Sequence, residues 1–562
     1  MKRLAALALA VMCLGVTAGC TVSRTTVAAA PDDATSLAQR AGAPLFDGMG
    51  SHHHPITTSS SDAQRYFDQG LVIDFAFNHA ESARSFRAAQ QLDPSAAMAY
   101  WGEALALGPN INVTSDGKAV MAAADREQAY AAIQKAVALS ASASAKERDY
   151  IAALATRYDG NPNTSRVPLD LDYMNAMRQL HERYPDDDDA AALFAESIMN
   201  TMPWDYWVDG DNPKPLAAEA IDVLERVLAR SPDHPMALHL YIHAVEASSN
   251  PQRAEAAADT LLTLVPGAGH LVHMPAHIYW RIGRYNDASA ANMLAAKVDE
   301  DYIAACNAQG FYPAAYYPHN IHFLWAASSM EGRSELAIAS ARKVAKNVAI
   351  EMVEAYPSVE FFKTIPLLSL TQFGKWRDVL AEPAPPENLE YSTAIWHYAR
   401  ATAFARTGNV AAAKSEHAKL EPLRASADIE FLDTLLYPAT MLLEIADNLV
   451  AGEIAVGEKR YGDAVDDFEK AVAVQDALPY TEPPFWYYPT RHSLGRALLL
   501  QGNAAAAEDV YRKDLELYPR NGWAMFGLVQ SMQAQGKDAS EIEARFAFAW
   551  RNADVTLTGS RF

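Results

Sequence analysis

The feature that most constrains the fold is a helical pattern that recurs with a period of 34 residues. Residues 63–96 carry aromatic, small and proline residues at spacings that fit two amphipathic helices joined by a turn. The same phase returns at 235–268 and again at 269–302, without a gap between them. Alternating apolar and polar residues, the pattern of β-strands, are almost absent. We therefore expect an all-α chain built as a right-handed superhelix of helix-turn-helix repeats, that is, a helical solenoid with several inserted loops.

The first unit resembles the tetratricopeptide repeat (TPR), through Tyr66, Gly70, Ser82, Phe86, Ala89 and Pro94. Small residues at such positions let two helices approach closely, and a proline ends the second helix. We expect an N-terminal TPR-like solenoid over 61–345 and a C-terminal one over 346–562. Long insertions at 107–123, 201–215, 298–317 and 476–489 are expected to be functional or partner-facing loops.

The net charge of the chain limits the classes of partner that it can bind. The 562 residues include 47 Lys and Arg against 69 Asp and Glu, which gives a net charge of −22. Such a field repels phosphate backbones and anionic lipid headgroups. We expect no nucleic-acid partner, and a membrane association only through an N-terminal lipid anchor.

The N-terminus has the pattern of an export signal. Lys2 and Arg3 precede an apolar stretch, and the run that ends at Cys20 resembles a bacterial lipobox. We predict a lipoprotein-type signal peptide over 1–19, acylation of Cys20 and a flexible tether over 20–60. This places the protein in the bacterial cell envelope, lipid-anchored, with the outer membrane and its periplasmic face as the expected location. Plain secretion is the alternative.

Histidines give the strongest functional signal. Seven of the 16 histidines fall between His239 and His322. Two i, i+4 pairs, His239 with His243 and His273 with His277, lie 34 residues apart and so occupy equivalent positions of adjacent repeats. Imidazoles at i, i+4 share a helix face and can converge on one ion. These four residues are the predicted metal ligands, and His270, His319 and His322 are further candidates.

Neutral imidazole nitrogen suits zinc or copper better than calcium or magnesium, and we expect a Zn or Cu cofactor if a metal binds. Glu246 follows His243 by about one helical turn and is the candidate acid/base. The alternative to a metal site is a polar ligand groove, whose further lining residues would be Glu196, Asn200, Trp204, Trp280, His492 and Arg496.

Five phrases, FAFNH, AMAYWGEALALGPN, HLYIHAVEAS, GHLVHMPAHI and HNIHF, resemble a group of exported bacterial TPR proteins. This resemblance implies the fold and the envelope location but supplies no reaction. We expect a binding scaffold whose concave, histidine-rich groove holds a transition metal or a polar ligand. The alternatives are a metalloenzyme of unknown reaction built on that groove, and an assembly scaffold that binds only a protein or peptide in it.

Overall fold

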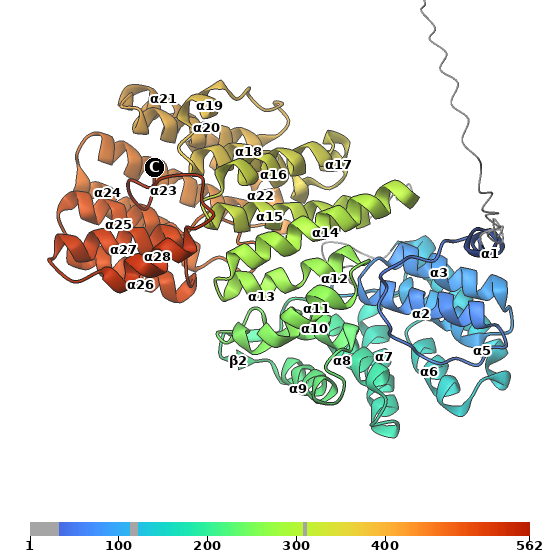
Figure 1. Cartoon of the computed structure of the whole chain (residues 1–562). Helices are drawn as coiled ribbons and strands as arrows, with labels where there is room; N and C mark the ends of the chain where they lie inside the picture. The colour runs from blue at the N-terminus through green and yellow to red at the C-terminus, as the bar shows by residue number, and fades with distance from the viewer. Residues whose placement is uncertain (1–32, 113–121, 307–311, 436) are drawn as a thin grey trace, which may run out of the picture.

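A computed structural model describes residues 33–112, 122–306, 312–435 and 437–562. The predicted signal peptide, Cys20 and the first part of the predicted tether lie outside these residues. Within them the chain is helical almost throughout, and Figure 1 shows the helices following one another from the blue N-terminal end to the red C-terminal end. The all-α prediction is confirmed.

The helices as far as the histidine-rich region begin with a short N-terminal helix and continue as antiparallel pairs. They are α1 (Asp33–Ala41), α2 (Ser61–Phe75), α3 (His79–Leu92), α4 (Ala97–Ala106), α5 (Ala123–Leu139), α6 (Ala145–Ala155), α7 (Arg166–Arg183), α8 (Asp188–Thr201), α9 (Pro215–Arg230), α10 (Pro235–Val245), α11 (Glu255–Leu264), α12 (Gly269–His273), α13 (Pro275–Arg281) and α14 (Tyr285–Cys306). Short 3₁₀ turns are η1 (Ser140–Ser142) and η2 (Pro251–Ala254), and a π turn is η3 (Tyr312–Tyr316).

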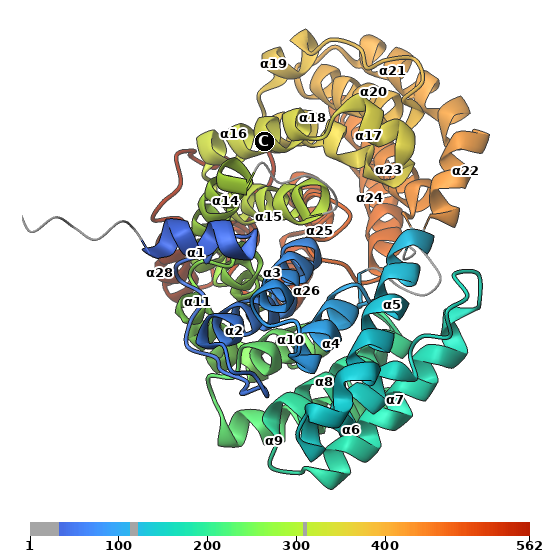
Figure 2. The same ribbon diagram turned by 90° about the vertical axis from the view of Figure 1, so that its right-hand side faces the viewer.

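The remaining helices continue the array in the same manner. They are α15 (Tyr317–Met330), α16 (Ser334–Asn347), α17 (Ile350–Ala355), α18 (Phe361–Gln372), α19 (Trp376–Ala381), α20 (Glu390–Arg406), α21 (Val410–Arg424), α22 (Ala427–Thr434), α23 (Ala439–Gly457), α24 (Tyr461–Asp476), α25 (Arg491–Gln501), α26 (Ala504–Leu517), α27 (Gly522–Ala534) and α28 (Ser540–Ala549), with a 3₁₀ turn η4 (Pro357–Val359). Helix α16 packs on α18, so the stacking continues across the predicted division at residue 345. Figure 2 shows the array curving through space.

Small residues explain the close packing of the first repeat. A Cβ atom added to Gly70 would lie 2.9 Å from the ring of Phe86, and one added to Gly102 would lie 2.3 Å from it. The ring therefore packs directly on the backbones of α2 and α4. This is the physical meaning of the small and aromatic positions in the repeat pattern.

The C-terminal half packs back on the N-terminal half. Gly283 ends the turn before α14 with φ +76°, and a Cβ atom there would lie 2.0 Å from the carbonyl oxygen of Pro519. The indole Nε1 of Trp523 donates a hydrogen bond to the carbonyl of Ser329 over 3.0 Å. The carboxylate of Asp554 accepts from two backbone N–H groups at the start of α16, at 2.7 and 2.9 Å.

The predicted tether over 20–60 is wrong in its C-terminal part. The hydroxyl of Tyr66 donates to the carbonyl of Ala43 over 2.6 Å, and Nδ1 of His54 lies 2.6 Å from the carboxylate of Asp189. Burial of Leu37 and Ala43 in a small apolar cluster with α2 and α3 holds this segment further. Sequence reasoning treated this segment as polar, and missed that its histidines have carboxylate partners.

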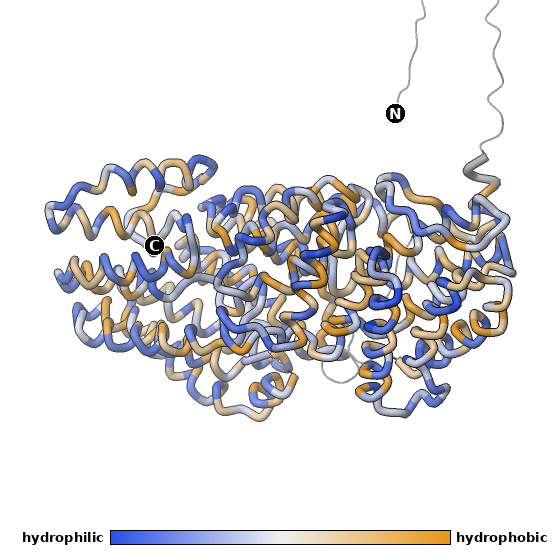
Figure 3. Tube along the Cα trace, turned by 90° about the horizontal axis from the view of Figure 1, so that it is seen from below, coloured by the Kyte–Doolittle hydropathy of each residue, from blue (hydrophilic) through white to orange (hydrophobic). Residues whose placement is uncertain are grey.

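Of the predicted insertions, 201–215 forms a short antiparallel hairpin, β1 (Trp207–Asp209) and β2 (Asn212–Pro213). The insertion predicted at 298–317 is shorter, because α14 continues to Cys306. Figure 3 shows polar and apolar residues interspersed along the helices. Among the described residues, none of the helices has the length and apolar character to cross a membrane.

Candidate functional site: a buried histidine chamber

Four helices carry the histidines. Helix α10 begins with Pro235 after the N-cap His234, whose ring nitrogen accepts from a backbone N–H in the first turn, and it presents His239 and His243 one turn apart. The next repeat is broken into α12 and α13 at Met274 and Pro275. Helix α15 follows η3 and brings in the last ligand candidate.

Six imidazoles gather in two groups of three, which we call the first and second triads; together they form the histidine chamber. The first triad is His239, His243 and His270, and the second is His273, His277 and His319. The candidate ligand atoms of each triad all lie within 4.8 Å of one another. The triads are neighbours, with ring centroids 5.4 Å apart for His243 and His277 and 5.7 Å apart for His270 and His273.

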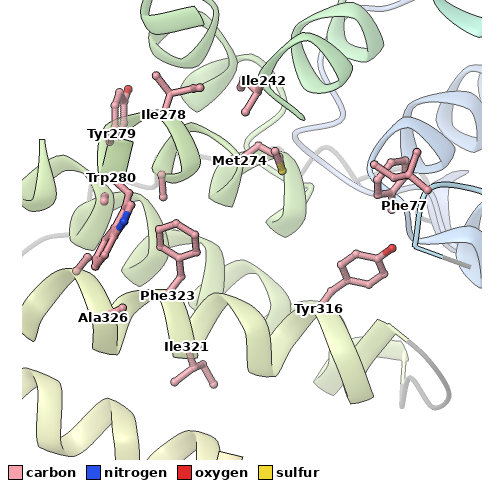
Figure 4. Packing of buried hydrophobic residues seen from close by; sticks show 14 of the residues in the cluster. Phe77, Ile242, Met274, Ile278, Tyr279, Trp280, Tyr316, Ile321, Phe323 and Ala326 are labelled. Carbon is pink, nitrogen blue, oxygen red and sulfur yellow. The ribbon is translucent and has the colours of Figure 1, made fainter. Parts of the chain in front are cut away.

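Aromatic rings from distant parts of the chain enclose the chamber. Phe77, in the turn between α2 and α3, lies with its ring centroid 4.4 Å from that of His239 and 5.4 Å from that of His270. The ring centroid of Phe323, in α15, lies 5.2 Å from that of His273, and the ring centroid of Tyr316 lies 4.8 Å from that of His270. Figure 4 shows Phe77 reaching in from the blue N-terminal ribbon while Phe323 and Tyr316 come from α15 and the turn before it.

Burial keeps most of these imidazoles neutral. His239 and His273 are completely buried and His270 is 2% exposed. Loss of solvation, followed by the proximity of other histidines, lowers the pKa of His239, His270 and His273 well below its usual range. A neutral imidazole is the form that binds a metal ion.

In four of the six rings, Nδ1 donates a hydrogen bond to an oxygen outside the chamber. His239 donates to the carbonyl of Phe75 over 2.6 Å. His243 and His277 donate to the two oxygens of Glu246, over 2.9 and 2.6 Å. His273 donates over 2.6 Å to Oδ1 of Asn292, whose Nδ2 is occupied by the carbonyl of Ala288. These bonds leave the Nε2 lone pairs directed into the chamber.

Several of these ring nitrogens have no hydrogen-bond partner among the described residues. Nε2 of His239 and of His243 is buried without a partner, and both ring nitrogens of His270 are as well. In the second triad the Nε2 atoms of His273 and His277 face each other at 2.9 Å. Because Nδ1 of each ring donates to an outer oxygen, this contact joins two lone pairs when both rings are neutral, and it is a hydrogen bond only when one ring carries a second proton on Nε2. A cation shared by such nitrogens would satisfy them.

Glu246 is buried at the junction of the two triads. Burial opposes its ionisation, but the charge of His277 and the hydrogen bonds from His243 and His277 outweigh burial and lower the pKa of Glu246 below its usual range. The carboxylate is thus engaged by both rings. Its geometry fits a residue that orients two imidazoles better than the acid/base predicted from the sequence.

A loop from the C-terminal half covers this junction. Tyr480, in the loop between α24 and α25, donates to Glu246 over 3.4 Å and also to Glu482. Arg281 places its guanidinium 5.3 Å from the centre of the Tyr480 ring. The Glu482 side chain is 2% exposed and lies 3.5 Å from Nδ1 of His277; burial and the charge of Glu246 raise its pKa well above its usual range.

Two of the other predicted residues border the chamber and one does not enter it. Trp204 lies with its ring centroid 5.0 Å from that of His243 and is 47% exposed. Trp280 is buried, and its ring centroid lies 6.0 Å from that of Phe323. His322 belongs to neither triad: it stacks on Trp325 at 5.2 Å, and burial alone lowers its pKa to about 3.

The remaining predicted groove residues lie elsewhere or have other partners. Glu196 and Asn200 are buried on α8; burial, followed by the charge of Asp74, raises the pKa of Glu196 to about 7. His492 lies 3.0 Å from a carboxylate oxygen of Asp514, and Arg496 lies 3.9 Å from Glu453. Carboxylate neighbours make these last two residues a poor site for an anionic ligand.

Sequence reasoning missed Phe77, Asn292, Tyr480 and Glu482. Phe77 stands in the FAFNH phrase and adopts φ +58°, and Tyr480 and Glu482 lie in the insertion at 476–489 that is predicted to be functional.

A further cluster lies outside the chamber, where His52, His54 and His234 surround Asp189 at 2.6 to 3.2 Å. Their hydrogen bonds overcome the effect of burial and lower the pKa of Asp189 well below its usual range, so the cluster fastens the N-terminal segment.

No protein-family model matches the chain, and no curated protein does. Among solved structures, a human IFIT1 dimer with m7Gppp-AAAA is similar at 12% identity over 88% of this chain and 91% of that chain, with a TM-score of 0.32. Yeast Tom70 is similar at 12% identity over 88% and 92%, with a TM-score of 0.27. The Cut9–Hcn1 hetero-tetramer of the APC/C is similar at 13% identity over 87% and 92%, with a TM-score of 0.26. By its own geometry, the chain is an all-α helical solenoid folded around a buried histidine chamber.

Proposed function

We propose that the histidine chamber binds transition-metal ions, with zinc and copper as the chemical class. The observation that carries the proposal is the contact of 2.9 Å between Nε2 of His273 and Nε2 of His277, in rings whose protons are already fixed on Nδ1. Two acceptors held this close in a buried site repel each other unless a proton or a metal cation lies between them or beside them. Neutral imidazole donors favour zinc and copper over magnesium and calcium.

The outer hydrogen bonds support the same proposal. Metal-binding histidines in proteins commonly donate their second ring N–H to a carboxylate or carbonyl, which fixes the tautomer. His239, His243, His273 and His277 all have such an acceptor. Buried N–H groups need acceptors in any case, so the observation that favours a metal is that the opposite nitrogen, Nε2, of His239 and of His243 has no partner among the described residues.

The test is metal analysis of untagged protein, followed by isothermal titration of apoprotein with Zn(II) and Cu(II) at pH 7.5. Wild type should take up metal, and the double variant His243→Ala/His277→Ala should lose it. His322→Ala is the matched control, because it also removes a buried imidazole from the same region but leaves both triads intact. Equal uptake by wild type and a folded double variant would refute metal binding and favour the polar ligand groove.

The location of the protein is part of the proposal. An acylated Cys20 would anchor the solenoid at the bacterial outer membrane, facing the periplasm, and the sequence around Cys20 is its support. Cys20→Ser should move the protein from the membrane fraction to the soluble fraction. Unchanged fractionation together with an unmodified N-terminal peptide would count against the anchor.

A second candidate is a scaffold that binds a protein or peptide. It is favoured by an open cavity of about 650 Å³ between the turn before α14 and helix α28, lined by Arg284, Arg545 and Phe548 among others, where Phe548 is 65% exposed. Since the chamber is buried, a peptide would bind at such an outer surface. Capture of a defined envelope protein by wild type but not by Arg545→Glu/Phe548→Ala would support this role, and equal capture by both proteins would remove the cavity from it.

A further inference from the structure

We infer that the chamber holds two metal ions, one in each triad, with a small oxygen ligand such as hydroxide between them. This inference rests on the proposed metal binding. It adds the number of ions and the coordination position that the protein leaves free on each ion. The first observation is the grouping itself. The candidate nitrogen atoms gather in threes, and among the described residues the only other group that reaches across is His243, Glu246 and His277.

Each triad offers its own set of unsatisfied nitrogens. In the first triad these are Nε2 of His239, Nε2 of His243 and the ring nitrogens of His270. In the second they are the facing Nε2 atoms of His273 and His277. The ring centroid of His319 lies 4.7 Å from that of His273, which places a third imidazole beside this pair.

The hydrogen bonds prevent one ion from using both sets. His243 and His277 hold Nδ1 toward Glu246, so their Nε2 atoms point away from that carboxylate, one into each triad. A single ion at Glu246 would have to displace both of these protons. Two ions, one in each triad, leave all four outer hydrogen bonds in place.

Three protein ligands are the pattern of a metal site that keeps a position free for water or substrate, whereas structural sites are usually closed by four. Six neutral imidazoles also leave the charge of two divalent ions uncompensated, except for the neighbouring carboxyl groups of Glu246 and Glu482. A hydroxide-sized anion between the triads supplies charge and fills the free position of both ions. The enclosing Phe77 and Phe323 rings leave an apolar boundary that favours a small ligand.

The experiment uses the full-length protein, stripped with a chelator and dialysed against Cu(II) or Zn(II), with the bound metal counted by mass spectrometry. Wild type should bind two ions per chain. His239→Ala/His270→Ala should bind one ion in the second triad, His273→Ala/His319→Ala should bind one in the first, and His322→Ala should bind two. Circular dichroism of each protein confirms that the variant is folded.

The copper form provides a second readout. Two Cu(II) ions joined by hydroxide couple magnetically, so the wild-type protein should show much less electron paramagnetic resonance signal than two free spins, while each triad variant shows one full spin. Glu246→Gln should still bind two ions, with affinity lower by about 10- to 100-fold because an orienting partner is weakened.

The outcomes separate this inference from the proposed function. One ion per wild-type chain, or complete loss of metal in Glu246→Gln, would overturn the two-ion centre but leave metal binding intact. Two full, uncoupled spins in wild type would overturn the bridging ligand. No bound metal in any form would refute the proposed function itself.

Discussion

Gly269, the first residue of α12, stands directly before the chamber histidine His270 and has no room for a side chain. A Cβ atom there would lie 2.0 Å from Oδ1 of Asp299 and 2.6 Å from its Cγ. That carboxyl group accepts from Tyr312 over 2.8 Å and from Asn320 over 2.7 Å. Gly269→Ala must therefore displace either α12 or Asp299 by about 1.4 Å or more to reach an ordinary contact distance.

The size of the effect follows from these contacts. Overpacking a well-filled interior costs about 1–3 kcal/mol. Displacing Asp299 also weakens two hydrogen bonds, each with a net contribution of about 0.5–1.5 kcal/mol. We expect Gly269→Ala to lower the free energy of unfolding by about 2–5 kcal/mol and to weaken metal binding in both triads, because His270 and His273 both lie on α12.

The assay is urea unfolding followed by circular dichroism, together with a metal titration. Gly462→Ala is the matched control: Gly462 is also in the first turn of a helix, α24, but its nearest neighbouring atom is 3.8 Å from the added Cβ. This control should be neutral or gain up to about 1 kcal/mol from helix propensity. If the two variants had equal stabilities and metal affinities, the close contact with Asp299 would contribute neither to stability nor to the position of His270.

Three further predictions concern the walls of the chamber. Phe77→Ala should cost about 3–5 kcal/mol by urea unfolding, and Phe77→Gly should cost about 1 kcal/mol less because glycine tolerates φ +58°; the reverse order would show that the backbone there is unstrained. Burial, as the main cause, raises the pKa of Asp299 to about 7, above its unfolded value of about 3.9, so its stabilising contribution is present at low pH and is lost as the pH rises through about 7. Asp299→Asn cannot ionise and should gain about 2–3 kcal/mol relative to wild type between pH 5 and pH 8, whereas a pH-independent difference would contradict the raised pKa. Tyr480→Ala should speed chemical modification of His277 by diethyl pyrocarbonate several-fold while Tyr480→Phe stays near wild type, and equal rates in all three would mean that the loop does not cover the chamber.

Local periodicity made four of the six imidazoles of the chamber predictable. The i, i+4 spacing and the 34-residue repeat place His239, His243, His273 and His277 on equivalent faces of adjacent helices, and the structure brings all four together. His322 is a further candidate from the sequence that lies apart from both triads. Three residues turn a helix by about 300°, so His322 lies about 60° around α15 from His319 and meets α18 instead.

The enclosure of the chamber could not be predicted in this way. Phe77 reaches His239 across more than 160 residues of chain, and Tyr480 reaches Glu246 across 234. Such contacts depend on how far the array curves, which is the accumulated result of many small rotations between neighbouring helices. A repeat pattern predicts the structure of each helix pair, but it does not predict the total rotation along the array.

The return of the C-terminal half onto the N-terminal half also restricts how this protein can change in length. An open array gains or loses a repeat by duplication or deletion, and the rest of the molecule is merely displaced. Here one additional helix pair between α16 and α24 would shift everything after it by about 10 Å for each packed helix. Trp523 would leave Ser329, Asp554 would leave the start of α16, and Tyr480 would leave Glu246. The number of repeats in this stretch is therefore fixed by the contacts that join the C-terminal half to the N-terminal half. Within this stretch, related sequences can differ by substitutions and by the length of outward-facing loops, but not by whole repeats.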